Sequence, residues 1–172
     1  MSDIYRDSAF IELLLSQLRS NPSVLKKAKA LKLEATDFEA PGAYDLPVYK
    51  YIAQLTLSEA SAPVDMMVSV MRLKELRLPT HLEQQVLETL FRLPAAVNES
   101  ASNFVTDNLL PFIKARRSAK IIAEAGGDVE KVAAECKKVI FPLDFLDVSD
   151  APTDRKSTRL NSSHLGISYA VF

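Results

Sequence analysis

Residues 98–141 read NESASNFVTDNLLPFIKARRSAKIIAEAGGDVEKVAAECKKVIF, and this stretch decides the fold. A helical pattern begins at Asn98 and ends at Gly126-Gly127, because glycine readily adopts the left-handed conformation that closes many helices. Asp128 is suited to cap a second helix, so the sequence predicts two antiparallel helices joined by the Gly-Gly turn. Pro111 lies inside the first arm and is expected to kink or split it. The apolar positions of the second arm are Val129, Val132, Ala133, Cys136, Val139 and Ile140.

Five shorter helices are predicted upstream of this hairpin. Each has apolar residues at helical spacing, which favours packing into a compact bundle. The predicted fold class is therefore all-α, with a helical head at 1–97 and the helical hairpin at 98–141. The five helices are expected at Ser8 to Arg19, Asn21 to Leu31, Leu46 to Leu57, Pro63 to Arg77 and Thr80 to Leu93.

Several of these helices have candidate N-terminal caps. Asn21 and Asp45 carry the short polar side chains that bond to first-turn amides. Thr80 and Glu83 fit a capping box, in which the hydroxyl and the carboxylate satisfy amides reciprocally. In the fourth helix the residues that share an apolar face are Val64, Val68 and Met71.

The composition is that of one ordinary soluble domain. The chain has 172 residues, 48% of them hydrophobic, with 21 Lys+Arg against 22 Asp+Glu. This balance excludes a collagen-like repeat and a strongly basic nucleic-acid arm. No apolar run approaches the ~20 residues that span a bilayer, and the first residues lack a signal-peptide pattern. A cytoplasmic location without membrane contact is expected.

No catalytic, cofactor or metal site is predicted. The glycines are too few to form a phosphate-binding loop, so ATP and magnesium are not expected to bind these residues. Cys136 is the single cysteine, and with two histidines the chain offers no zinc ligand set. His81 lies in the first turn of a helix, where a solvated or capping role is typical. We therefore expect no catalytic activity in this chain.

Two surfaces of the hairpin are candidates for interaction. The densest basic cluster is either a solvated helix face or a contact to an acidic partner or phosphate. The apolar surface of the hairpin exceeds what two arms can cover against each other, which favours a second copy of the chain as partner. The basic cluster consists of Lys114, Arg116, Arg117 and Lys120. The predicted self-association seam, called the hairpin seam below, consists of Ile121, Ile122, Val129, Val132, Ala133, Cys136 and Val139.

The last residues resemble a translated sequencing adapter. Residues 154–164, DRKSTRLNSSH, resemble an in-frame translation of the common short-read adapter. Leu165-Gly166 falls where that adapter has a variable index, and residues 167–172, ISYAVF, resemble the constant sequence that follows. We therefore expect 154–172 to be a non-native, adapter-derived tail.

The order of the helices resembles the N-terminal domain of DnaB-type replicative DNA helicases, over Asp7 to Ile140. This chain departs from the family in lacking its Glu-Ala-Glu-Gln start, in having Leu13-Leu14-Leu15 at a Gly-rich step, and in Pro111. The departures are those of a divergent member. The similar segments are Ala9 to Leu18, Ala35 to Glu39, Val48 to Ile52, Pro63 to Asp65, Asn103 to Ile122 with Lys114 to Arg117, and Asp128 to Phe141.

The resemblance implies a function in DNA replication. In that family the ATPase is a RecA-like domain that follows a linker, so 142–153 would be the start of a linker to a motor domain missing from this sequence. The fragment would then form the N-terminal collar of a ring, with hairpins paired between subunits. Primase and a helicase loader are the implied partners, and DNA would be contacted only through the full-length parent.

A second interpretation is a small helical adaptor or helix-turn-helix regulator. The consecutive short helices between Leu46 and Leu93 allow it. A recognition helix needs basic and amide residues in its first turns, whereas Thr80 to Gln85 includes Glu83 at that place. The oligomeric state separates the two interpretations, because a collar domain is expected to self-associate and a helical adaptor is expected to be monomeric.

We predict that removing residues 154–172 leaves the thermal midpoint unchanged, because a translated adapter has no selected partner surface. Differential scanning calorimetry of the chain ending at Thr153 checks this. A midpoint lower by several degrees, which corresponds to ~1 kcal/mol or more for a domain of this size, would instead identify the tail as native structure.

Overall fold

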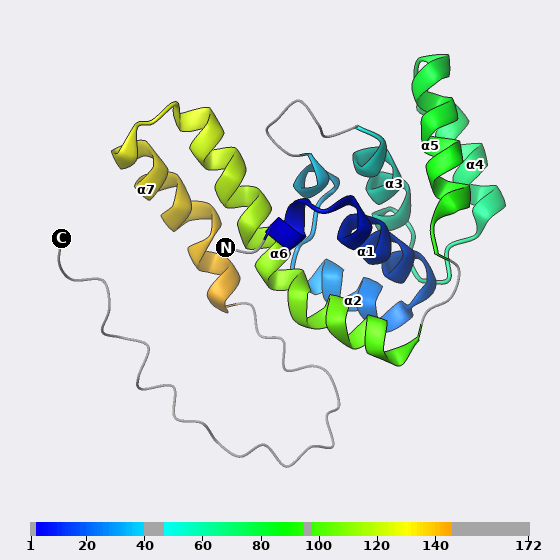
Figure 1. Cartoon of the computed structure of the whole chain (residues 1–172), viewed down its shortest axis with the longest axis horizontal. Coiled ribbons are helices and arrows are strands. Elements are labelled where there is room, and N and C mark those ends of the chain that lie inside the picture. The colour runs from blue at the N-terminus through cyan, green and yellow to red at the C-terminus, as the bar shows by residue number, and fades with distance from the viewer. Residues whose placement is uncertain (1–2, 40–46, 95–97, 146–172) are drawn as a thin grey trace, which may run out of the picture.

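The computed structural model describes residues 3–39, 47–94 and 98–145, and all regular structure in these ranges is helical. Five short helices precede a hairpin of two helices, which confirms the predicted all-α architecture (Figure 1). None of these helices has the length and apolar character needed to cross a bilayer. The α-helices are α1 (Ser8–Ser20), α2 (Pro22–Ala30), α3 (Val48–Leu57), α4 (Met66–Glu75), α5 (Thr80–Arg92), α6 (Glu99–Ala125) and α7 (Val129–Val139), and the 3-10 helices are η1 (Asp3–Arg6), η2 (Ala35–Phe38) and η3 (Phe141–Phe145).

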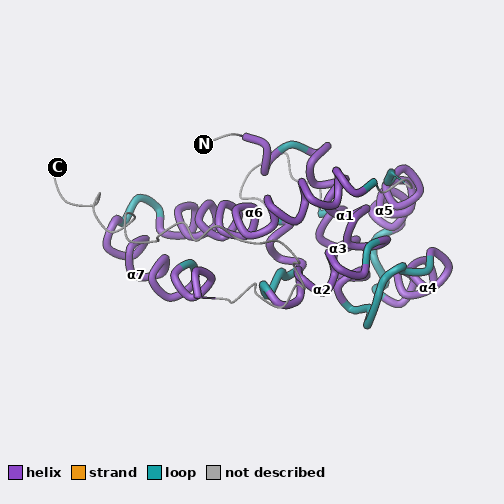
Figure 2. Tube along the Cα trace, turned by 90° about the horizontal axis from the view of Figure 1, so that it is seen from below, coloured by secondary structure: helices purple, strands orange, loops and turns teal. Residues whose placement is uncertain are grey.

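Helix α1 lies at the centre of the head. It packs against α2, α3 and α6, and in Figure 2 it lies between α6 and the α4–α5 pair. The apolar residues of its predicted stripe are at most 4% exposed. The buried apolar residues of α1 are Phe10, Ile11, Leu14, Leu15 and Leu18.

The predictions of which residues cap or end the helices are confirmed at three positions and wrong at one. Asn21 Oδ1 accepts hydrogen bonds from the amides of Ser23 (3.0 Å) and Val24, and Asp128 Oδ1 accepts one from Lys131 (3.1 Å). Gly126 has φ 60°, the left-handed conformation predicted for the turn. The capping box at Thr80 is absent, because Pro79 occupies the N-cap position and no side chain bonds the first-turn amides there.

Helix α3 begins later than predicted. Its first residue is Val48, and Pro47 occupies the N-cap position. The predicted start at Leu46 and the candidate cap Asp45 lie outside the described residues.

Helix α4 corrects the predicted apolar face. Val68 and Met71 are exposed, whereas Ser69 and Leu73 are buried. The reason is Arg19 of α1, a buried cation whose Nη1 donates a hydrogen bond to Ser69 Oγ at 3.1 Å. Burial lowers the pKa of Arg19 from its ordinary value, and the nearby carboxylate of Glu59 opposes that shift. Because the buried guanidinium requires a hydrogen-bond acceptor, α4 packs with Ser69 facing the core.

Helix α6 is one continuous helix that contains Pro111. Of the two predicted outcomes, a kink or a split, the kink is the one observed, since the two halves of this helix run in different directions in Figure 1. The N-terminal half of α6 packs in the core of the head. The part of the hairpin that projects from the head therefore begins well beyond the boundary expected at residue 98. The residues of α6 buried in the head core are Val105, Leu109, Phe112 and Ile113.

The chain after α7 turns back to the core. The linker was expected to start at residue 142, but Phe141–Phe145 forms η3 and Leu143 is buried among core residues. The remainder of the predicted linker, 146–153, and the adapter-derived segment 154–172 lie outside the described residues.

We predict that Ser69→Ala lowers the free energy of unfolding by about 2 kcal/mol, because it removes an acceptor from a buried cation. The matched change Val68→Ala should stay within about 0.5 kcal/mol, since Val68 faces solvent. Urea unfolding of both variants measures the two values. A larger loss for Val68→Ala than for Ser69→Ala would instead support the predicted apolar face of this helix.

Candidate functional site

The base of the hairpin is anchored to the head by Arg116. Its side chain is 4% exposed, and its Nε and Nη2 donate hydrogen bonds to the carbonyls of Asp37 (2.9 Å) and Phe38 (3.0 Å). The guanidinium carbon lies 5.8 Å from the centre of the Phe112 ring, which in turn is 5.4 Å from the Phe38 ring. A buried charge is stable only with such partners, so Arg116 fixes η2 against α6.

The neighbouring Arg117 completes this anchor. Its Nε donates to Asp37 Oδ1 at 2.7 Å and its Nη2 donates to Asp37 Oδ2 at 2.9 Å, which is a bidentate pair. The same Nη2 lies 2.6 Å from the carbonyl of Lys32. Hydrogen bonding to Asp37 raises the pKa of Arg117 from its ordinary value, so the guanidinium stays charged. Asp37 therefore bonds α6 through both its backbone and its side chain.

The structure brings three residues of the predicted basic cluster to one cleft and leaves Lys114 outside it. Arg116 and Arg117 hold the head and the hairpin together, and they line one cleft with the exposed Lys120. Lys114 is half-buried and does not line that cleft. A contact of Lys114 or Lys120 with phosphate or an acidic partner stays a prediction.

The cleft lies between η2, α6 and α7 and has a volume of about 390 Å³. Its wall carries charges of both signs, so it favours no single class of ligand by charge. No group of three potential metal ligands occurs in the described residues, where His81 is exposed and Cys136 half-buried. The charged residues of the wall are Glu34, Asp37, Arg116, Arg117, Lys120, Glu124, Lys131 and Glu135.

The hairpin seam is divided between contact within the chain and exposure. Ile121 is 9% exposed, and Val132, Cys136 and Val139 are half-buried. Ala133 is exposed, as are Ile122 at 57% and Val129 at 78%, and none of these three lines the charged cleft. Since α7 has no fully buried residue, the residues that the structure describes leave much of the seam uncovered.

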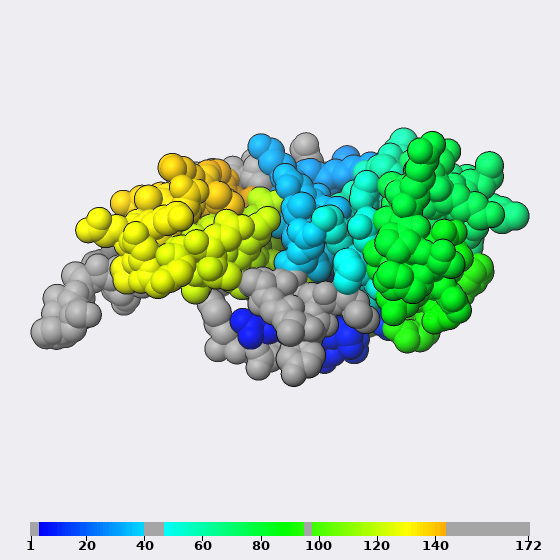
Figure 3. Space-filling model, turned by 90° about the horizontal axis from the view of Figure 1, so that it is seen from above, coloured from blue at the N-terminus to red at the C-terminus, as the bar shows by residue number. Residues whose placement is uncertain are grey.

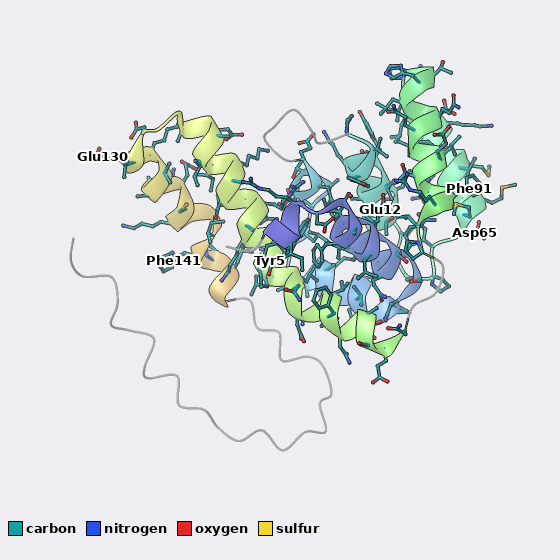
Figure 4. The ribbon with its side chains drawn as sticks, viewed as in Figure 1. Tyr5, Glu12, Asp65, Phe91, Glu130 and Phe141 are labelled. Atoms are coloured by element: carbon teal, nitrogen blue, oxygen red, sulfur yellow. The ribbon has the colours of Figure 1, made fainter. Side chains whose placement is uncertain are left out.

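A second apolar surface, which the sequence analysis missed, lies at the other end of the molecule. Met67 and Met71 of α4 are 70% and 66% exposed, and Phe91 of α5 is 68% exposed. Figure 4 shows Phe91 and Asp65 at the same end of the α4–α5 pair, far from Glu130 on the hairpin. Helical spacing alone did not mark Phe91 as exposed, since neighbouring apolar residues such as Phe10 and Ile11 of α1 are both buried.

We predict that Arg116→Met lowers the free energy of unfolding by about 3 kcal/mol, because two buried carbonyls lose a charged donor. Lys120→Met, four residues further along the same helix, should change it by less than about 0.5 kcal/mol. Guanidinium chloride unfolding followed by circular dichroism distinguishes the two. Equal effects would show that Arg116 is not an anchor.

No known family model, curated protein or solved structure matches the chain. The functional interpretation therefore rests on the hairpin, its anchor on the head and its exposed residues.

Proposed function

We propose that the chain is a self-association and docking module without catalysis of its own, acting as the N-terminal collar domain of a DnaB-type replicative helicase. The observation that carries this proposal is the exposure of Ile122 and Val129 on an anchored hairpin. The identity of the helicase rests on the resemblance of the helix order and of the quoted segments. ATP and magnesium would bind a motor domain outside this sequence.

The position of the hairpin supports a role in assembly. In Figures 1 and 3 the hairpin forms one end of an elongated molecule, and α4 and α5 form the opposite end. The hydrogen bonds of Arg116 and Arg117 hold the base of the hairpin on η2. A projecting element with a fixed base presents the same surface to every partner and loses little conformational freedom on binding.

The exposed residues of the hairpin seam supply the driving force. Complete burial of one such aliphatic side chain contributes about 1.5–3 kcal/mol, so Ile122 and Val129 together favour a covering partner. In a symmetric pair each residue is buried twice, once on each copy, which doubles that contribution. A second copy is therefore the economical partner for this surface.

The far end of the head suits a different partner. The three exposed residues Met67, Met71 and Phe91 lie away from the hairpin, so a copy bound there would not cover the seam. Methionine adapts its shape to varied surfaces, which is typical of docking sites. By resemblance, primase or a helicase loader is the kind of protein that would dock on the collar.

We predict that Val129→Asp and Ile122→Asp each convert the associated protein to monomer, because the new carboxylate would have to be desolvated in the interface. Both side chains are exposed in the single chain, so the folded monomer should persist with unchanged helicity. Light scattering at tens of micromolar measures the mass, and circular dichroism measures the fold.

The matched control is Gln85→Asp, which adds the same carboxylate to an exposed position on α5 and should leave the mass unchanged. If the original chain is itself monomeric at this concentration, the collar proposal fails and a monomeric helical adaptor becomes the better interpretation.

A further inference from the structure

The exposed side of α2 is basic. From Leu13 to Leu33 the chain has five cationic residues and no acidic one. The apolar side of α2 is buried in the head core, whereas Lys26 and Lys29 lie on its exposed side and Lys32 follows the helix, also exposed. These three lysines, spaced at every third residue, are called the basic row below.

No carboxylate of the described residues neutralises the basic row. Lys26 and Lys32 form no ion pair there, and Lys29 Nζ donates only to the backbone carbonyl of Glu59. The carboxylate of Glu59 is itself paired with Arg72 at 2.8 Å. The row therefore presents three positive charges to a partner.

Lys32 adopts a backbone conformation that its residue type disfavours. Its φ is 55°, in the left-handed region that glycine usually occupies where a helix ends. The Leu33 amide donates to the carbonyl of Ala28 at 2.9 Å, which fixes this end of α2. Glycine would adopt the same conformation without steric cost, so the lysine here indicates a role for its ammonium group outside the fold.

The chemistry of α2 favours phosphate over protein. Among the described residues, none of the large apolar side chains that are exposed lies on α2, and no aromatic residue occurs from Asn21 to Leu33. A protein partner needs apolar or aromatic anchors, and single-stranded nucleic acid needs aromatic rings on which its bases stack. The backbone of duplex DNA needs only charge, since it presents regularly spaced phosphates along its surface.

We infer that α2 binds the phosphate backbone of duplex DNA through Lys26, Lys29 and Lys32, without preference for sequence. This contact belongs to the head of this chain, whereas the resemblance to helicases implies DNA contact only through the full-length parent. It does not depend on the proposed self-association, because the basic row lies outside the hairpin seam. The affinity is expected to be modest and strongly dependent on salt, since the release of counterions supplies it.

Fluorescence anisotropy of a labelled DNA duplex of mixed sequence, titrated with the full chain over a series of salt concentrations, tests the contact. The logarithm of the binding constant should fall with the logarithm of the salt concentration at a slope of about −3, because each neutralised phosphate contributes about 0.9. Lys26→Gln and Lys29→Gln should each weaken binding about threefold at low salt and reduce the size of the slope by about 1.

The variant Lys32→Gly separates binding from folding. It removes one charge of the basic row and gives the left-handed position the residue type that favours it. Binding should weaken about threefold, as for the other two lysines, while the thermal midpoint does not fall. Unfolding then cannot explain the loss of binding.

Two further variants control for charge. Asp107→Asn removes an exposed carboxylate beside α2, since the carbonyl of the adjacent Thr106 accepts a hydrogen bond from Lys27 Nζ at 3.2 Å. This variant should bind the duplex more tightly. Lys137→Gln removes the same charge as the test variants from an exposed position on α7, and it should leave binding unchanged.

Several outcomes would overturn the inference. It fails if the original chain does not bind the duplex at low salt, or if Lys26→Gln and Lys29→Gln bind as tightly as the original chain. It also fails if polyglutamate of equal charge displaces the labelled duplex better than unlabelled duplex does, because the partner is then an acidic protein. If Lys32→Gly binds as tightly as the original chain, Lys32 serves only the end of α2 and the three-lysine contact is overturned. Light scattering of the original chain tests self-association separately, so the two proposals fail independently.

Discussion

The guanidinium of Arg116 is buried where α6 leaves the head, and such a charge requires acceptors that the chain must supply nearby. The backbone carbonyls of Asp37 and Phe38 supply them, and the Phe38 ring packs on Phe112 beside the same guanidinium. The segment η2, far from α6 in sequence, is thereby held against it. The direction of the hairpin, the cleft beneath it and the exposure of its seam all depend on this contact.

Pro111 shows why one helix can serve both parts of the molecule. Proline removes an amide donor, so the carbonyl of Asp107 loses its helical partner. Both Pro111 and Asp107 are exposed, which lets water satisfy that carbonyl and keeps the helix continuous. The buried residues on either side, Leu109 and Phe112, hold the helix in place by packing. Solvent exposure on one face and burial on the other therefore explain why the helix changes direction at Pro111 and yet stays continuous.

Sequence reasoning succeeded where a structure depends on neighbouring residues. The caps at Asn21 and Asp128 and the turn at Gly126 follow from local chemistry, and the helix order followed from periodicity. It failed where the burial or role of a residue depends on a partner that is far away in the sequence. Ser69 is buried because of Arg19, fifty positions away, and Arg116 is an anchor because of η2, about eighty positions away. A basic residue in the sequence does not reveal whether its partner is internal or external.

The hairpin consequently has two chemically different sides. The cleft side carries Lys120, Glu124 and Glu135 near the anchor, where charges of both signs face η2 and solvent. Ile122 and Val129 lie off that cleft and expose apolar surface without a cover in the described residues. A charged side resists burial against another protein, since desolvating it costs free energy, whereas an apolar side gains from burial. The division of one helix pair into these sides determines which of them a second chain can cover.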